Sequence, residues 1–224
     1  MTNAAQKFGT DPAEVTRLPA HEVIYRELRD LVLYGDLAPG QAVTINGLAE
    51  RLGAGVTPIR EAIRRLISGG ALEFQGNRRV SVPILSAAHI GELIVARQWL
   101  DPHLMARATL RASAGDICTL ERLDADLDAA ITLGDLHGYL RLNYRFHSEI
   151  YKLADAPILA DLADGLWLRF GPSLRVVCGR MGTQNLPDKH KEALVAMRDG
   201  DADAAARAIT EDVIQGMEQV RQGL

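Results

Sequence analysis

Cysteine, aromatic residues and long apolar runs are all scarce in this sequence. The two cysteines among 224 residues, Cys118 and Cys178, form neither a CxxC pair nor a zinc-finger spacing, which argues against a disulfide framework. No apolar run approaches the roughly 18 residues that a membrane span needs, and the polar start of the chain contains no apolar signal segment. We therefore expect a cytoplasmic protein without a membrane partner.

The rest of the composition is typical of a folded protein with an uneven charge distribution. Apolar residues make up 47% and charged residues 24% of the chain, which excludes a disordered or collagen-like chain. Residues 17–83 carry nine basic and seven acidic side chains, whereas residues 84–224 carry fifteen and twenty. A basic segment beside an acidic body indicates contact with a polyanion, although an ordinary solvated face could carry the same charge.

Hydrophobic spacing predicts three helices within residues 17–83, after a polar segment at 1–16 that we expect to be disordered. The first helix begins at Ala20, the second is capped by Thr44, and the third opens at Thr57 after a glycine-rich break. Apolar and polar residues then alternate on both sides of a Gln-Gly-Asn turn, which predicts a β-hairpin. Three helices followed by a hairpin form a winged helix-turn-helix, a unit that binds DNA.

The third helix and the hairpin tip carry the side chains that such a unit would use on DNA. A recognition helix lies in the major groove, where arginine pairs with two acceptors of guanine. The exposed side chains of the predicted helix are Thr57, Arg60, Arg64 and Arg65. The hairpin tip can meet phosphates or the minor groove through Asn77, Arg78 and Arg79. The alternative is a winged helix used for protein contact, with these arginines as a solvated face.

The same region resembles the N-terminal domain of GntR-family transcription regulators. The matching motifs are GDLAPG at 35–40, LAERLG at 48–53 and TPIREAI at 57–63. The resemblance implies that the family's DNA-reading arginine is Arg60 and that its wing glycine is Gly76. The chain departs from the family at Gly55 and Val56, where Ser-Arg is usual, so one common DNA contact is absent.

Residues 86–221 are rich in alanine and leucine with helical periodicity, which predicts a mainly α protein with a helical C-terminal domain. We predict helices at 86–111, 116–133, 135–154, 157–178, 187–199 and 201–221, with a kink at Pro102. This array resembles the FCD domain found in the FadR subfamily of GntR regulators, in its shorter, VanR-like form. The resemblance implies a domain for effector binding and dimerisation.

In metal-binding FCD domains, an Asp and a His on one helix join one His from each of the last two helices. The resemblance places these ligands at Asn143, His147, His190 and Asp212. Two positions depart from the family, because Asn143 stands for its Asp and Asp212 for one of its His residues. Such a set suits a divalent metal such as zinc, nickel or manganese. Hydrogen-bonded cavity residues without a metal are the alternative, since an amide is a poorer ligand than a carboxylate.

The spacing of these four residues along the chain also supports their grouping into one site. Asn143 and His147 are four residues apart and share a helix face. His190 lies ten residues before Gly200 and Asp212 twelve after it, so an antiparallel helical hairpin places both side chains about 15–18 Å from its turn.

Arg97 resembles the arginine that points into the effector cavity of FCD domains, where it could pair with an effector carboxylate. A salt bridge to Asp101, four residues later, is the alternative. We expect Trp99, Trp167 and Phe170 to belong to the core.

These observations predict a DNA-binding transcription regulator that acts as a repressor and is not an enzyme. Its helical domain would bind a small organic acid, and it would act as a homodimer on a palindromic operator, because two-fold symmetry lets two copies read two half-sites. A metal-dependent hydrolase fused to a DNA-targeting domain and a helical adaptor are the alternatives. The sequence lacks H-E-x-x-H and G-x-S-x-G, which weakens the hydrolase alternative.

Overall fold

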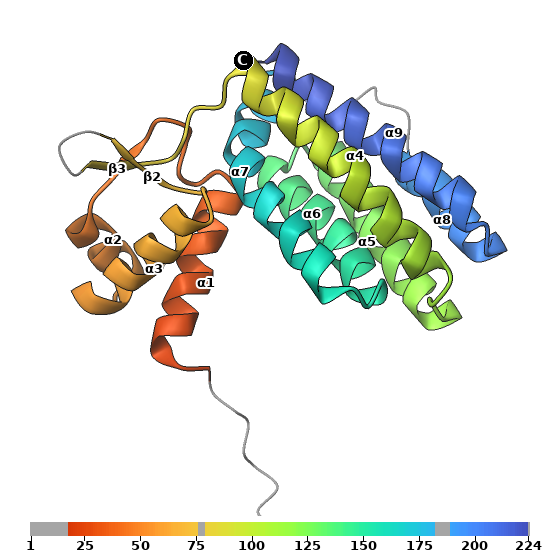
Figure 1. Ribbon diagram of the computed structural model, residues 1–224, viewed down its shortest axis with the longest axis horizontal. Helices are drawn as coiled ribbons and strands as arrows, with labels where there is room; N and C mark the ends of the chain where they lie inside the picture. Colours follow the sequence, from red (N-terminus) through yellow and green to blue (C-terminus); the bar gives the residue numbers. More distant parts are fainter. Residues whose placement is uncertain (1–17, 76–78, 182–188, 224) are drawn as a thin grey trace, which may run out of the picture.

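The computed structural model describes residues 18–75, 79–181 and 189–223, and this part contains nine helices and three short strands. A small domain that carries the sheet lies beside a bundle of longer helices (Figure 1). The elements are α1 (Ala20–Leu33), β1 (Ala42–Val43), α2 (Ile45–Leu52), α3 (Val56–Ser68), β2 (Glu73–Gln75), β3 (Arg79–Ser81), α4 (Ala87–Thr109), α5 (Ala114–Leu133), α6 (Leu136–Leu153), α7 (Pro157–Met181), α8 (Lys189–Asp199) and α9 (Ala202–Gln222). The predicted fold class, a winged helix-turn-helix followed by a helical bundle, is confirmed.

Local signals set the boundaries of α2 and α3. The Thr44 side chain accepts a hydrogen bond from the backbone N–H of Gly47 at 3.1 Å and so caps α2. Gly53 ends this helix in the left-handed conformation, with φ of 59°, which favours glycine. The third helix begins at Val56, one residue before the predicted start, and its N-cap residue, Gly55, offers no side-chain hydrogen bond.

The wing is a three-stranded antiparallel sheet in the order β1-β3-β2. Phe74 pairs with Val80 in the predicted hairpin, and Val43 of β1 pairs with Val80 from the other side. Strand β1 has only two residues, so the alternation that predicts a strand could not reveal it. The wing-tip residues Gly76, Asn77 and Arg78, and the segment 1–16, lie outside the described residues.

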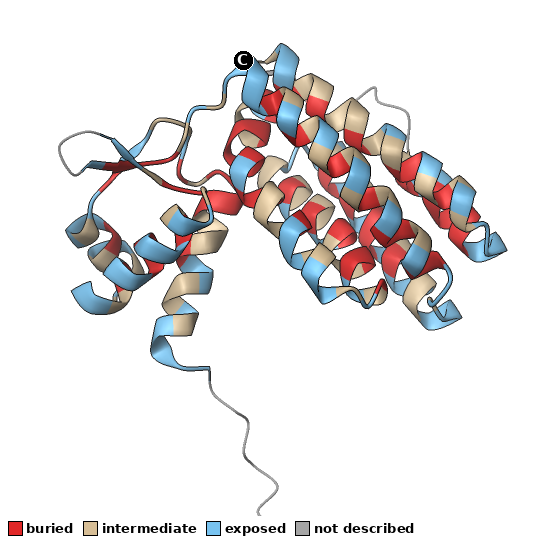
Figure 2. Cartoon of the chain, in the orientation of Figure 1, coloured by how far each residue is buried: buried red, intermediate tan, exposed pale blue. Residues whose placement is uncertain are grey.

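The helical domain contains the predicted helices, although residues 187 and 188, where the helix predicted at 187–199 would begin, lie outside the described part of the chain. Serine side chains cap the starts of α4 and α5, and Gly134 and Gly200 adopt the left-handed conformation where α5 and α8 end. Pro102 lies inside α4, which continues as one helix from Ala87 to Thr109. Buried residues line the inner faces of the bundle, as Figure 2 shows.

The two domains meet where the end of α1 crosses α7 (Figure 1). Gly171 allows this close approach, because a Cβ atom there would lie 2.3 Å from the carbonyl oxygen of Leu33. Arg175 of α7 donates a hydrogen bond to the carbonyl oxygen of Tyr34 at 3.2 Å and pairs with Asp36 at 3.4 Å. The C-terminal end of α1 is therefore held directly by the helical domain.

Candidate DNA-binding face and metal centre

One face of α3 is available to a partner. Thr57, Arg60 and Arg64 are exposed, while Ile59, Ala62, Ile63 and Leu66 of the same helix are buried. Arg64 lies 3.9 Å from Glu61, and both side chains are more than half exposed, so this pair holds Arg64 weakly. In the described part of the chain, Arg60 makes no ion pair. Arg79 of the wing is also exposed.

Arg65, which the sequence groups with the DNA contacts, is exposed but contacts α1 of the same domain. Its Nη1 atom lies 2.8 Å from a carboxylate oxygen of Glu22 on α1, and its guanidinium lies 3.4 Å from the centre of the Tyr25 ring. The hydrogen bond to Arg65 lowers the pKa of Glu22. Arg65 therefore connects α3 to α1.

His147, His190 and Asp212 converge inside the helical domain, and they come from α6, α8 and α9. His147 Nε2 lies 3.2 Å from Asp212 Oδ2, and His190 Nε2 lies 3.6 Å from Asp212 Oδ1. One ligand atom from each residue falls within 4.8 Å of the others. The helical hairpin of α8 and α9 thus brings together the two side chains that the spacing around Gly200 predicted to lie at one level.

The protonation states at this cluster suit metal ligation. Burial by itself would raise the pKa of Asp212, but His190, His147 and Arg97 outweigh it and hold this pKa at about 2, so the carboxylate is ionised. Burial lowers the pKa of His147, against the opposing effect of Asp212, so the ring is neutral at pH 7. A neutral imidazole and an ionised carboxylate are the forms that bind metal ions.

A second carboxylate stands behind each histidine. Asp124 Oδ1 lies 3.3 Å from His190 Nδ1, and Asp101 Oδ1 lies 3.7 Å from His147 Nδ1. Both aspartates are buried, on α5 and α4 respectively. Each histidine therefore directs Nε2 toward Asp212 and Nδ1 toward a buried carboxylate.

Arg97 lies on the cavity wall and forms the salt bridge to Asp101 that the four-residue spacing offered as the alternative. It lines the same cavity as the histidines and pairs with Asp101 at 2.9 Å. Asp101 also accepts a hydrogen bond from the Tyr151 hydroxyl at 2.5 Å, and that hydroxyl accepts one from Trp167 Nε1 at 3.0 Å. Burial disfavours the charge of Arg97, but Asp101 and Tyr151 outweigh it and raise its pKa. Arg97 is thus a fixed cation at the cavity wall.

The cavity has a volume of about 430 Å³, enough for a small organic molecule. Asn143 lines it together with the histidines and Asp212. Its two lining cations are already paired, Arg97 with Asp101 and Lys189 with Glu192 and Glu211. An acid that entered the cavity would therefore meet the ionised Asp212 without a compensating free cation on the described walls.

The sequence missed one residue of the site and misplaced one aromatic residue outside it. The sequence reasoning missed Asp124, although an aspartate within the apolar stripe of Leu120, Leu123 and Leu127 is an anomaly that could have revealed it. Trp167 and Phe170 are buried as expected, and the Arg97 guanidinium lies 4.7 and 4.8 Å from their ring centres. Trp99 was expected in the core but is 70% exposed, because it lies on the outer face of α4.

Fold and site together define a class of protein: a regulator with a winged helix-turn-helix and a helical domain that contains a cavity. The family model of bacterial regulatory proteins of the gntR family matches residues 20–82, and the FCD domain matches residues 92–214. The chain therefore belongs to the GntR family and carries an FCD domain. It is a DNA-binding transcription regulator with an effector-binding helical domain. No described helix is long and apolar enough to cross a bilayer.

Known proteins agree with this assignment. The HTH-type transcriptional regulator McbR of Escherichia coli is 31% identical over 67% of this chain and 68% of its own length. The HTH-type transcriptional repressor RspR of Escherichia coli is 24% identical over 91% of this chain and 90% of its own. The solved structure of E. coli McbR superposes with a TM-score of 0.86 at 26% identity, over 92% of this chain and 99% of that one.

Proposed function

We propose that the helical domain binds a divalent metal through His147, His190 and Asp212, with the amide oxygen of Asn143 as a further ligand. The observation that carries the proposal is the convergence of two histidine Nε2 atoms on one ionised carboxylate in the wall of the cavity. Zinc, nickel and manganese all suit this ligand set. A bound ion would supply open coordination positions for a carboxylate oxygen of the effector.

The effector that fits this cavity is a small organic acid. The described cations that line the cavity are already paired with carboxylates. The positive charge of a metal ion would therefore be needed to offset the repulsion between Asp212 and an anionic effector. Arg97 is placed to hold a second polar group of the acid, since it lies on the wall of the same cavity. The site binds its ligand and does not turn it over.

The metal site is tested by exposing purified protein to zinc, nickel and manganese and measuring bound metal by elemental analysis. The wild type should retain one ion per chain, and the double variant His147→Ala, His190→Ala should retain none. His103→Ala is a matched control, because His103 lies outside the cavity and contacts the carbonyl oxygen of Trp99. If the wild type binds none of the three metals, the cluster is only a polar cavity.

We further propose that α3 reads DNA through Thr57, Arg60 and Arg64, while the wing contributes Arg79 and the tip residues Gly76, Asn77 and Arg78. Arg60 supports this because it is exposed and makes no ion pair within the described residues. Arg60→Ala should weaken binding by about 1–3 kcal/mol, measured by fluorescence anisotropy on a DNA site selected from a random library. Unchanged affinity at fixed salt would show that Arg60 does not contact the DNA.

The active species that fits this arrangement is a homodimer that represses from a palindromic operator in the cytoplasm. Large apolar side chains exposed on α4 and α7 support a contact between two copies, among them Val95, Trp99, Ile158 and Leu162. A single winged helix offers a small DNA contact area, and two symmetric copies double it. Sedimentation at micromolar concentration tests this proposal, and a species of only 24.4 kDa would contradict it.

A further inference from the structure

Asp124 is a buried carboxylate on α5 that faces the back of the metal cluster. Its side chain is 5% exposed, and its Oδ1 atom lies 3.3 Å from His190 Nδ1. Its other oxygen lies 3.8 Å from the ammonium of Lys191, which pairs more closely, at 2.6 Å, with Asp128. Burial of a carboxylate is costly unless the carboxylate accepts hydrogen bonds. The Nδ1 atom of His190 is placed to donate such a bond to Asp124.

The His190 ring is held from three directions. Nδ1 faces Asp124, and Nε2 lies 3.6 Å from Asp212 Oδ1. The ring also stacks on Phe146, with 4.0 Å between centroids and 14° between planes. In a neutral imidazole one nitrogen carries the proton and the other keeps a lone pair. Carboxylates face both nitrogens, but Asp124 lies closer to Nδ1, at 3.3 Å, than Asp212 lies to Nε2, at 3.6 Å, so the form with the proton on Nδ1 and the lone pair on Nε2 is favoured.

We propose that Asp124 is a positioning residue that holds His190 in the Nδ1–H tautomer, so that Nε2 is preset as a metal ligand; the metal-binding part of this inference rests on the proposed function. A carboxylate behind a ligating histidine also makes that ligand more basic. His147 has a weaker version of the same arrangement, because Asp101 is 3.7 Å from its Nδ1 and already binds Arg97 and Tyr151.

The tautomer is tested on the metal-free protein by two-bond ¹H–¹⁵N correlation spectra of labelled histidine, recorded above the histidine titration range. His190, assigned from His190→Gln, should show the Nδ1–H pattern in the wild type and lose it in Asp124→Ala. Asp124→Asn keeps an acceptor oxygen and should restore the pattern in part. Asp126→Ala is the matched control, because it removes the same charge from an exposed position on the same helix.

Zinc affinity, measured by competition with a chelator, provides the second readout. Asp124→Ala should bind zinc about 10–100-fold more weakly than the wild type, with Asp124→Asn in between and Asp126→Ala unchanged. Circular dichroism and the melting temperature verify that each variant is folded.

The possible results separate this inference from the metal proposal. An Nε2–H pattern in the wild type, or an unchanged pattern in a folded Asp124→Ala, overturns the role of Asp124 whether or not zinc binds. Wild-type zinc affinity in Asp124→Ala overturns it as well. If the tautomer depends on Asp124 but the wild type binds no metal, the positioning role stands and the metal site is wrong.

Discussion

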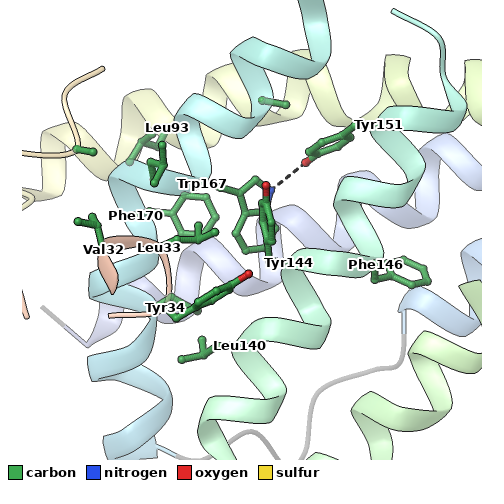
Figure 3. Packing of buried hydrophobic residues seen from close by; sticks show 14 of the residues in the cluster. Val32, Leu33, Tyr34, Leu93, Leu140, Tyr144, Phe146, Tyr151, Trp167 and Phe170 are labelled. Atoms are coloured by element: carbon green, nitrogen blue, oxygen red, sulfur yellow. Dashed lines mark hydrogen bonds between the residues drawn. The ribbon is translucent and has the colours of Figure 1, made fainter. Parts of the chain in front are cut away.

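Tyr144 lies between α1 of the DNA-binding domain and Trp167 of the cavity wall, so we expect its hydroxyl to contribute to the stability of the domain junction. The hydroxyl accepts a hydrogen bond from Arg29 Nη2 of α1 at 2.6 Å and donates one to Asp164 Oδ1 at 3.0 Å. Its ring packs edge-on against Trp167, which lines the cavity, with 5.5 Å between centroids (Figure 3). Tyr144→Phe keeps this ring contact and removes only the two hydrogen bonds.

The expected loss follows from the surroundings of Arg29. A hydrogen bond that involves a charged group contributes about 1.5–3 kcal/mol. The Arg29 side chain is 18% exposed and retains ion pairs with Asp30 and Asp164 at 3.4 and 3.8 Å. These pairs offset part of the loss, so we expect the free energy of unfolding to fall by about 1–2 kcal/mol. Burial raises the pKa of Tyr144 to about 12, so the loss should not vary with pH in the neutral range.

Urea unfolding followed by circular dichroism measures this loss, and hydrogen exchange of the α1 amides locates it. Exchange should become faster in α1 and remain unchanged at the far end of the bundle. Tyr139→Phe is the matched control on the same helix, because the Tyr139 hydroxyl makes no hydrogen bond within the described residues. A change below about 0.5 kcal/mol for Tyr144→Phe, or equal changes in both variants, would refute the reasoning.

Three further outcomes are expected. Arg65→Ala should lower the midpoint of urea unfolding and leave the salt dependence of DNA binding unchanged; a slope reduced by about one would instead indicate a direct phosphate contact. The metal-free protein should lose thermal stability as the pH falls below about 6.5. Burial lowers the pKa of His147 in the folded protein, so in this pH range His147 binds a proton more readily in the unfolded chain than in the folded one. His147→Gln should reduce this dependence. Trp99→Glu should convert the proposed dimer to monomers in sedimentation experiments, whereas Leu133→Glu, at the end of α5, should not.

The sequence predicts the elements of this fold well, because their signals are local. The Thr44 cap, the Gly53 break and the buried stripe of α3 all depend on residues a few positions apart. The pairing of His190 with Asp212 was also predictable, because one turn at Gly200 fixes the register of two regular helices. Strand β1 escaped prediction because two residues show no period.

Contacts between segments that are distant in the sequence were harder to predict. Arg65 and Glu22 are 43 positions apart, and nothing in the helical pattern of α3 distinguishes Arg65, which pairs with Glu22 of α1, from Arg64, which pairs with Glu61 of its own helix. Trp99 illustrates the opposite difficulty, since a large aromatic residue in a helix suggests the core, yet it lies on the outer face of α4. Asp124 was detectable in principle, because a charged residue that interrupts an apolar stripe must have a buried partner.

Side-chain contacts connect α3 to the cavity wall through α1. At one end of this route, the Arg97 guanidinium and the Tyr144 ring both contact Trp167 at the cavity wall. Tyr144 holds Arg29 in the middle of α1, and Glu22 in its first turn holds Arg65 of α3. Since α1 is a single helix of 14 residues, a displacement at Arg29 carries its N-terminal turn with it. Coupling along this route predicts that Tyr144→Phe changes DNA affinity as well as stability, whereas an unchanged affinity would show that these contacts only hold the two domains together.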